Sequence, residues 1–291
     1  IGVTSITVTV TDAALRTAQC SFSVTVTDAQ DPTITCPTNL TANNGIGSCA
    51  ASVVIPAITF DDNCTGESIT WSTSGATSLS GNGQPGTQTF NVGVTTVTVT
   101  VTDAALRTAQ CSFTVTVTDN QVPTITCPSN ITANNDANVC SASVAVPAAT
   151  FGDNCAGSGL AWTMSGATTG SGSGQMGTRS FNVGTTTVVY TVSDGASPAN
   201  TATCSFTVTI SDTQAPVITG CPANITRTAG SGSCTATVSW TEPLATDNCT
   251  ASESLVWTKS HLPGSSFTVG TTTVTYTAKD AANNTSLVCS F

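Results

Sequence analysis

Residues 95–135 read TTVTVTVTDAALRTAQCSFTVTVTDNQVPTITCPSNITANN, and their pattern decides the fold. Valine and threonine alternate on both sides of a polar turn at 103–110, which is the period of a half-buried strand and not of a helix. The turn reverses the chain, so the run 111–118 must pair antiparallel with the run before it. One face of the first run therefore points into a core, and it carries Val97, Val99 and Val101. Pro123 removes a backbone donor and fixes its own φ, which ends one domain and starts the next.

The same pattern recurs along the chain. Residues 6–44 match it almost letter for letter, and drifted copies follow. One cysteine has the same place in every copy, at steps of 91, 93 and 85 residues: Cys20, Cys111, Cys204 and Cys289. Repeats of this length are whole domains, so the sequence predicts beads on a string.

The copies set the expected domain boundaries. We expect residues 1–29 to be the last two strands of a preceding repeat, 30–120 and 121–213 to be complete repeats, and 214–291 to be a third repeat lacking its last strand. This arrangement indicates a segment of a longer polymer. In an alternative, residues 1–27 act as a donor strand pair for the unfinished repeat of the next chain.

Composition narrows the function classes. Only 8% of residues are charged, with 6 Lys and Arg against 16 Asp and Glu and a pI of about 4.1, which excludes nucleic acid as a partner. No apolar run approaches the ~18 residues that a membrane span needs. Thirteen cysteines at regular spacings, without the CxxC or Cys/His spacing of zinc sites, indicate an oxidising extracellular setting.

The order of elements can be followed in the second repeat. Seven or so short strands separated by turn residues predict an immunoglobulin-like β-sandwich, so the fold class is all-β, with such domains in tandem. The clearest strands are expected at 124–133, 140–146, 160–164, 178–183, 185–193 and 204–211. A Gly/Ser-rich flexible loop is expected at 165–177. We expect one core tryptophan per repeat: Trp71, Trp162 and Trp257.

Four short motifs recur in order and carry a resemblance to a known family. They are Cys-Pro in the first strand, Asp-Asn-Cys at 62–64, 153–155 and 247–249, Phe-x-Val-Gly at 90–93, 181–184 and 267–270, and Cys-Ser-Phe in the last strand. Together they resemble the hyalin repeat (HYR) domain over the whole chain. The resemblance implies a fold similar to immunoglobulin and fibronectin-type modules and a role in extracellular adhesion, and four-cysteine copies in long arrays resemble Bacteroidetes-like cell-surface adhesin repeats. The third repeat departs from its siblings, because it carries Trp240 in the strand expected after the first turn and a shorter Gly-rich segment.

Nothing in the sequence points to catalysis. His261 has no counterpart in the other repeats, and the Gly-rich segments at 81–86 and 170–177 lack the helix and lysine of a phosphate loop. Two functions remain: a structural stalk or filament segment of a cell-surface adhesin, and a glycan- or protein-binding module acting through loops 74–87 and 165–178. These loops hold no aromatic residue and near-identical copies supply length, so the stalk is favoured. Its partners would be neighbouring repeats, other copies in a fibre and an unknown surface ligand.

The cysteines predict two kinds of disulfide. If the first and last strands of a repeat run side by side, their sulfur atoms meet, which pairs Cys36 with Cys111, Cys127 with Cys204 and Cys221 with Cys289. The remaining cysteines of one repeat lie at opposite ends of a strand more than about 20 Å long. Bridges between successive repeats would then join Cys49 to Cys155 and Cys140 to Cys249. A bend that pairs Cys49 with Cys64, with equivalents in the other repeats, and free thiols are the alternatives.

Aspartates recur at three places in each repeat. They follow the last strand (Asp28, Asp119, Asp212), lie in the Asp-Asn-Cys loop (Asp62, Asp153, Asp247), and start the turn of the final hairpin (Asp103, Asp194, Asp280). All three places are expected at the junction with the preceding repeat, without basic residues nearby. Converging oxygen ligands suit Ca²⁺, which takes about 6–8 of them at about 2.3–2.6 Å. In the alternative, each aspartate only caps a turn.

Overall fold

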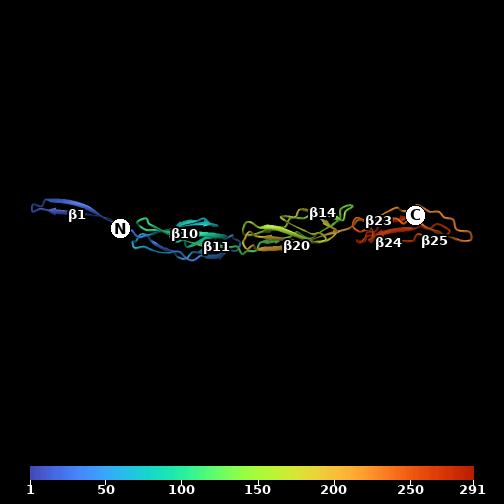
Figure 1. The fold of residues 1–291 in the computed structure, drawn as a ribbon, viewed down its shortest axis with the longest axis horizontal. Helices are drawn as coiled ribbons and strands as arrows, with labels where there is room; N and C mark the ends of the chain where they lie inside the picture. The colour runs from blue at the N-terminus through green and yellow to red at the C-terminus, as the bar shows by residue number, and fades with distance from the viewer. The chain divides into compact units, whose positions relative to one another are not determined.

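The computed structural model describes all residues 1–291 and is built almost entirely of strands (Figure 1). Its contacts fall into two compact units. The first contains residues 1–123 together with 153–158 and 194–200, and the second contains 124–152, 159–193 and 201–291. The all-β, tandem-sandwich prediction is confirmed. No helix is long and apolar enough to cross a membrane.

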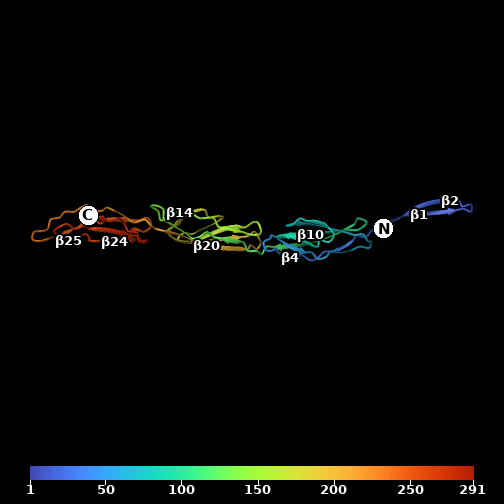
Figure 2. The ribbon, with the colours of Figure 1, turned by 180° about the vertical axis from the view of Figure 1, so that it is seen from behind.

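The first unit starts with a hairpin of β1 (Gly2–Thr11) and β2 (Thr17–Val26), followed by the first complete repeat. The strands of this repeat are β3 (Thr33–Thr35), β4 (Leu40–Asn43), β5 (Ala50–Val54), β6 (Thr59–Asp61), β7 (Ser68–Gly75), β8 (Ser80–Asn82), β9 (Thr87–Asn91), β10 (Gly93–Thr102) and β11 (Thr108–Thr118). They form a five-stranded sheet in the order β4-β11-β10-β7-β8, faced by the pairs β5-β9 and β3-β6. β10 and β11 lie side by side in Figure 1, and Figure 2 adds β4 from behind.

The alternating pattern produces this core. Val97, Val99 and Val101 on β10 are 0% exposed, as predicted, and Val115 on β11 is buried to the same extent. Phe90 from β9, in the facing pair of strands, packs in one cluster with Val97, Val99 and Val115. Each threonine between the valines points away from the core, so a slip of one residue would exchange the two faces.

In the second unit, the second repeat has the same topology. Its strands are β12 (Thr124–Thr126), β13 (Ile131–Asn134), β14 (Ser141–Ala145), β15 (Thr150–Gly152), β16 (Gly159–Gly166), β17 (Gly170–Ser173), β18 (Thr178–Asn182), β19 (Gly184–Ser193) and β20 (Thr201–Ser211). The sheet order is β13-β20-β19-β16-β17.

Two expectations for this repeat were wrong. The single strand predicted at 124–133 is split, because β12 pairs antiparallel with β15 while β13 pairs parallel with β20, and Pro128 between them cannot donate a backbone hydrogen bond. The Gly/Ser-rich segment predicted as a loop contains β17, which pairs with β16. Gly172 lies against the indole of Trp162, where a Cβ would be 2.7 Å from Cε2. The glycines are therefore needed for close packing of an edge strand over the core tryptophan.

The third repeat is less regular. Its strands are β21 (Val217–Thr219), β22 (Thr235–Val238), β23 (Leu244–Thr246), β24 (Val256–Lys259), β25 (Ser265–Thr268), β26 (Thr275–Lys279) and β27 (Cys289–Ser290), with a 3₁₀ turn η1 (Ser252–Ser254). A groove of about 850 Å³ lies between residues 224–229 and 267–274. In the second repeat, β20 fills the corresponding place between β13 and β19.

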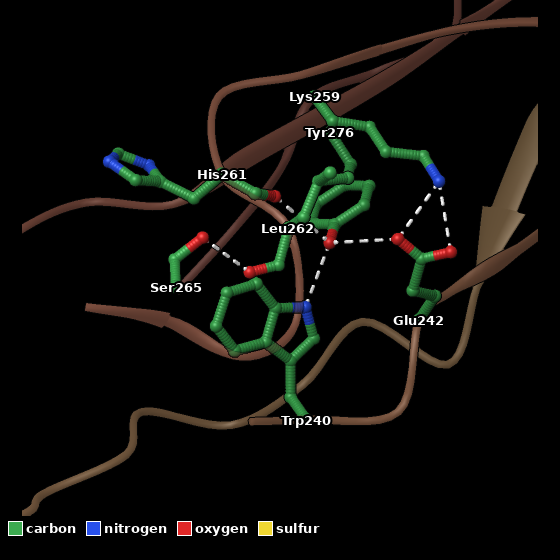
Figure 3. Close-up of polar contacts among 7 residues, drawn as sticks. All are labelled: Trp240, Glu242, Lys259, His261, Leu262, Ser265 and Tyr276. Atoms are coloured by element: carbon green, nitrogen blue, oxygen red, sulfur yellow. Dashed lines mark hydrogen bonds and ion pairs between the residues drawn. The ribbon is translucent and has the colours of Figure 1, made fainter. Parts of the chain in front are cut away.

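Trp240 follows β22 instead of lying within a strand, which corrects the expectation. Its indole N–H donates to the hydroxyl of Tyr276 at 2.8 Å, and Lys259 Nζ lies 2.9 Å from both carboxylate oxygens of Glu242 beside them (Figure 3). Tyr276 is fully buried, so the bond from Trp240 satisfies its hydroxyl inside the third core, whereas the Lys259–Glu242 pair is partly exposed. His261 contributes its backbone carbonyl to this cluster.

Candidate metal centres

In three acidic clusters, the segment that follows the last strand of one repeat, called the linker here, meets the Asp-Asn-Cys loop. The first cluster is Asp28, Asp62 and Cys64; the second is Asp119, Asp153 and Cys155; the third is Asp212, Asp247 and Asp280. Within each cluster, one side-chain oxygen or sulfur per residue lies within 4.8 Å of the others. The first two clusters lie in the first compact unit and the third lies in the second unit.

The linker aspartate of the second cluster is held by its neighbours on one side only. Asp119 is 3% exposed, and its Oδ1 accepts hydrogen bonds from Asn44 Nδ2 at 2.7 Å and from the Gln121 N–H at 3.1 Å. Its Oδ2 is buried and has no hydrogen-bond partner. Asp28, in the first cluster, likewise leaves Oδ2 buried and unpaired.

The loop aspartates adopt one conformation in all three repeats. Asp153 Oδ2 accepts from the Cys155 N–H at 3.0 Å, and Asp62 and Asp247 accept from Cys64 and Cys249 in the same way. In each case Oδ1 is buried without a partner. Half of each carboxylate thus caps its own loop, and the other half is free for a ligand.

The aspartates of the final hairpin differ from the expectation of a common cluster. Asp194 lies outside the second cluster, because its oxygens accept from the Asn200 N–H at 2.9 Å and from Asn200 Nδ2 at 2.6 Å. Asp103 lies outside the first cluster and accepts from the Arg107 N–H. Only Asp280 joins its cluster. The turn-capping alternative therefore describes Asp194 well.

The charge near the first cluster also differs from expectation. Arg107 Nη1 lies 2.9 Å from Asp31, and its Nε donates to the Asp28 carbonyl at 3.4 Å, so a basic residue is present there. At the other two junctions, a neutral asparagine takes the place of Arg107. Asn200 and Asn284 donate to the carbonyls of Asp119 and Asp212, each at 3.2 Å. The negative charge of the second and third clusters is therefore less compensated.

Electrostatics distinguish the first and third clusters. Burial raises the pKa of Asp212, and the charges of Asp247 and Asp280 raise it further. The pKa of Asp28 is lowered, chiefly by the hydrogen bond from the Gln30 N–H and next by the thiol of Cys64. A cation in the third cluster would remove the repulsion that burdens Asp212.

Sequence reasoning missed the asparagine of the Asp-Asn-Cys motif. Asn154 Nδ2 donates to the Ser48 carbonyl and Asn248 Nδ2 donates to the Val139 carbonyl, both at 3.0 Å. The Oδ1 atoms of both asparagines are buried without a partner. Recurrence of the motif in all three repeats was the available signal, but the carbonyl partners lie in the preceding repeat and no local pattern marks them.

Five disulfides are present. Three bridges join the segment just after the first strand of a repeat to its last strand, with Cα atoms 5.8, 5.7 and 5.7 Å apart: Cys36–Cys111, Cys127–Cys204 and Cys221–Cys289. Cys49–Cys155 and Cys140–Cys249 join successive repeats, with Cα atoms 4.9 and 4.8 Å apart. Cys20, Cys64 and Cys234 are free, so no bridge joins Cys49 to Cys64.

The unpaired oxygens decide whether a metal suits these clusters. Buried carboxylate and amide oxygens without hydrogen-bond donors are costly unless something compensates them. Hard divalent cations such as Ca²⁺ prefer such oxygen ligands. The carboxylates of the second and third clusters therefore suit a calcium ion, whereas the sulfur of Cys155 is engaged in a disulfide. The residues that would hold the ion are Asp119 and Asp153 in the second cluster, and Asp212, Asp247 and Asp280 in the third.

The chain is similar in sequence to hyalins of two species. Hyalin of Strongylocentrotus purpuratus is 36% identical over 204 residues, which are 68% of this chain and 16% of that protein. Hyalin of Lytechinus variegatus is 34% identical over 104 residues, which are 36% of this chain and 19% of that protein. The matched segments thus span less than a fifth of these curated relatives.

Solved cadherin structures give a weaker likeness. The whole chain aligns with 84% of protocadherin gammaB7 EC3-6 at 15% identity and a TM-score of 0.33. A second alignment covers 90% of the chain and 98% of mouse cadherin-23 EC22-24, at 15% identity and a TM-score of 0.34. Scores this low say nothing about ligands.

The family itself is shown by its own profile. The HYR domain matches residues 27–117, 118–210 and 211–291 in succession. Together with the hyalin relatives and the five disulfides, these matches indicate an extracellular protein with adhesion-related repeats. The resemblance carried by the four recurring motifs is confirmed, and this chain belongs to the HYR domain family.

Proposed function

We propose that this chain is a structural stalk or filament segment of a cell-surface adhesin, without catalytic activity. The observation that carries the proposal is covalent linkage between successive repeats, Cys49 to Cys155 and Cys140 to Cys249. A passive spacer gains from such links, because they restrict movement of one repeat against the next. A module that binds through separate loops has no need of them.

The proposed repeats run over 30–120, 121–213 and 214–291, with 1–29 as the last two strands of a preceding repeat. Two observations support these boundaries. The β1–β2 hairpin has the same residue-by-residue pairing as β10–β11, and the profile matches begin within about three residues of the proposed starts.

Calcium at the acidic clusters is part of this proposal. Bound Ca²⁺ would neutralise the carboxylates next to each inter-repeat disulfide and hold the linker against the Asp-Asn-Cys loop. The support is the set of buried oxygens without partners in all three clusters. Neighbouring repeats, and other copies in a fibre, are the proposed partners, together with a surface ligand bound elsewhere on the full protein.

The alternative function, binding through loops 74–87 and 165–178, has less support. These segments contain β8 and β17, whose Gly81 and Gly172 lie against Trp71 and Trp162. Both tryptophans are buried, so no aromatic platform for a glycan is exposed there.

Two measurements on chain 1–291 test the proposal. Proteolysis without reductant, followed by mass spectrometry, should yield peptides that join Cys49 to Cys155 and Cys140 to Cys249. A peptide joining Cys140 to Cys155 would contradict the stapled stalk. Titration of the chelator-treated chain with calcium in a calorimeter should release or absorb heat, and a thermal scan with calcium should show a higher melting temperature. Absence of both at millimolar calcium means that the aspartates only cap turns.

A further inference from the structure

Each inter-repeat disulfide is one of three contacts that join a turn of one repeat to the next repeat. The cysteine that ends the turn is bridged to the Asp-Asn-Cys loop, and the carbonyl before it accepts a hydrogen bond from the asparagine of that loop. One residue earlier, a backbone N–H donates to a glutamine side chain of the linker. We call these contacts the clamp, with a turn half and a loop half. The first clamp consists of Cys49–Cys155, Asn154 to Ser48 at 3.0 Å and Gly47 to Gln121 at 2.8 Å, and the second consists of Cys140–Cys249, Asn248 to Val139 at 3.0 Å and Asn138 to Gln214 at 2.7 Å.

The third repeat carries a turn half that is not bridged. Its residues 230–234 form the same turn as in the other two repeats, because the Ser233 N–H donates to the Gly230 carbonyl at 3.0 Å, against 3.0 and 3.3 Å at the equivalent positions. The φ of Gly232 is 81°, against 69° and 63° in the other turns. Cys234 at the end of the turn is free and exposed, whereas its two counterparts are bridged and half-buried.

The first repeat carries a loop half that is also not bridged. Cys64 is free, and its N–H donates to Asp62 Oδ2 at 3.1 Å, as the cysteines of the two bridged loops do at 3.0 Å. Asn63 and Gln30 are exposed, whereas their counterparts in both formed clamps are half-buried. The two unused halves therefore have the conformation of the clamp before any partner is present.

We propose that a second copy of this chain supplies the missing halves: Cys234 of one copy forms a disulfide with Cys64 of the next. Asn63 Nδ2 then donates to the carbonyl of Ser233, and the Gly232 N–H donates to Gln30 Oε1. The inference rests on the proposed function, in which other copies are partners in a fibre, and it names the residues that join them. Because the two halves differ, the contact is heterologous and copies join head to tail into open chains.

Formation of this disulfide needs an oxidant, for which oxidised glutathione serves. The thiolate of the exposed Cys234 attacks one sulfur of oxidised glutathione and releases one glutathione thiolate. The thiolate of Cys64 on the partner copy then attacks the Cys234 sulfur of the mixed disulfide and releases the second glutathione. Two protein thiols are oxidised, and one glutathione disulfide is reduced to two thiols, which take up the two protons.

The β1–β2 hairpin precedes Gln30 and must make room for the partner copy. It is exposed along its whole length and pairs with no strand outside itself, so no strand pairing within the chain holds it in place. Its cysteine, Cys20, is free and exposed but belongs to neither half of a clamp. Cys20 is therefore the matched control for thiols that are merely accessible.

The test uses chain 1–291 with Cys20→Ser, incubated as a monomer with reduced and oxidised glutathione. Products are separated by mass under denaturing conditions without reductant, and their digests are analysed by mass spectrometry. We expect a ladder of dimers, trimers and longer chains. Cys64→Ser and Cys234→Ser should each remain monomeric alone, whereas their equimolar mixture should give a dimer and nothing longer. The digest of that dimer should contain a peptide that joins Cys64 to Cys234.

A further substitution tests whether the whole clamp forms, and not the disulfide alone. Asn63→Ala in the Cys234→Ser chain removes the donor to Ser233 and should lower the equilibrium constant for dimer formation about 2- to 10-fold, the usual worth of one hydrogen bond. Restoring Cys20 in place of the serine should leave the yield of Cys64–Cys234 peptide unchanged, because Cys20 has no complementary half.

Four results would overturn the inference. They are no dimer in the mixture, an equal dimer yield from either variant alone, a Cys64–Cys234 peptide recovered only from monomer, and no effect of Asn63→Ala. The same digests report Cys49–Cys155 and Cys140–Cys249. If both bridges are present and no dimer forms, the stalk stands and only the joining of copies is removed. If both bridges are missing, the stalk and the joining of copies fall together.

Discussion

Gly172→Ala tests whether the Gly-rich segment is packed structure or free loop. An added Cβ would lie 2.7 Å from Trp162 Cε2 and 3.2 Å from Cη2, closer than real Cβ contacts allow. Trp162 is 3% exposed and cannot swing away, so β17 must shift from its place beside β16. Overpacking of this kind costs about 1–3 kcal/mol. In a domain of this size, that lowers the melting temperature by about 4–8 °C for each kcal/mol.

Gly152→Ala is the matched control. Nothing lies within 4 Å of its added Cβ, and Asp61 and Thr246 occupy the equivalent pairing positions in the other repeats. We expect the control to change stability by less than about 0.5 kcal/mol. Hydrogen exchange of peptides from β16 and β19 would report on the second repeat alone. Equal exchange in the two variants would refute the packing argument, because it would mean that the segment over Trp162 yields freely.

Three further predictions concern the thiols, the core and pH. Without reductant, iodoacetamide should label the native, monomeric chain only at the free cysteines, Cys20, Cys64 and Cys234, and leave the ten others unlabelled. Labelling of any bridged cysteine would contradict the assigned pairs. Val115→Ala removes fully buried methyl groups and should lower the free energy of unfolding by about 2 kcal/mol in urea titrations, whereas the exposed Thr118→Ala should be nearly neutral. Because the raised pKa of Asp212 makes the folded chain hold its proton longer than the unfolded chain, the calcium-free protein should lose stability as pH rises above 3.8, the ordinary value, through the folded pKa. Asp212→Asn should flatten that part of the melting profile, and an unchanged slope would show that this carboxyl does not cause it.

The features that could be predicted from sequence are those with a local period. Alternation at 95–102 and 111–118 gives β10, β11 and the face that Val97 and Val99 bury. The place of the Cys-Pro and Cys-Ser-Phe motifs at one end of the sandwich leads to bridges of the Cys36–Cys111 type, which the structure contains.

Features that depend on tertiary partners could not be predicted in this way. The pattern at 124–133 contains nothing to show that its two halves pair with different sheets. Glycine has low strand propensity, and what holds β17 is tertiary: its pairing with β16 and its close approach to the ring of Trp162. The hydrogen bond of Asn154 is equally hidden, because its acceptor lies 106 residues away.

The bridges within each repeat limit how far the chain can be stretched. Cys36–Cys111 and Cys127–Cys204 bypass 75 and 77 positions, which would carry no load if the repeats were pulled apart. Only 16 positions separate Cys111 from Cys127, and 17 separate Cys204 from Cys221. At about 3.3–3.6 Å per residue, each of these segments spans at most about 60 Å, against about 300 Å for an unbridged repeat. Tension applied to the ends is thus carried by sulfur–sulfur bonds. If a bridged repeat unfolds under tension, the chain lengthens much less than it would without the bridge.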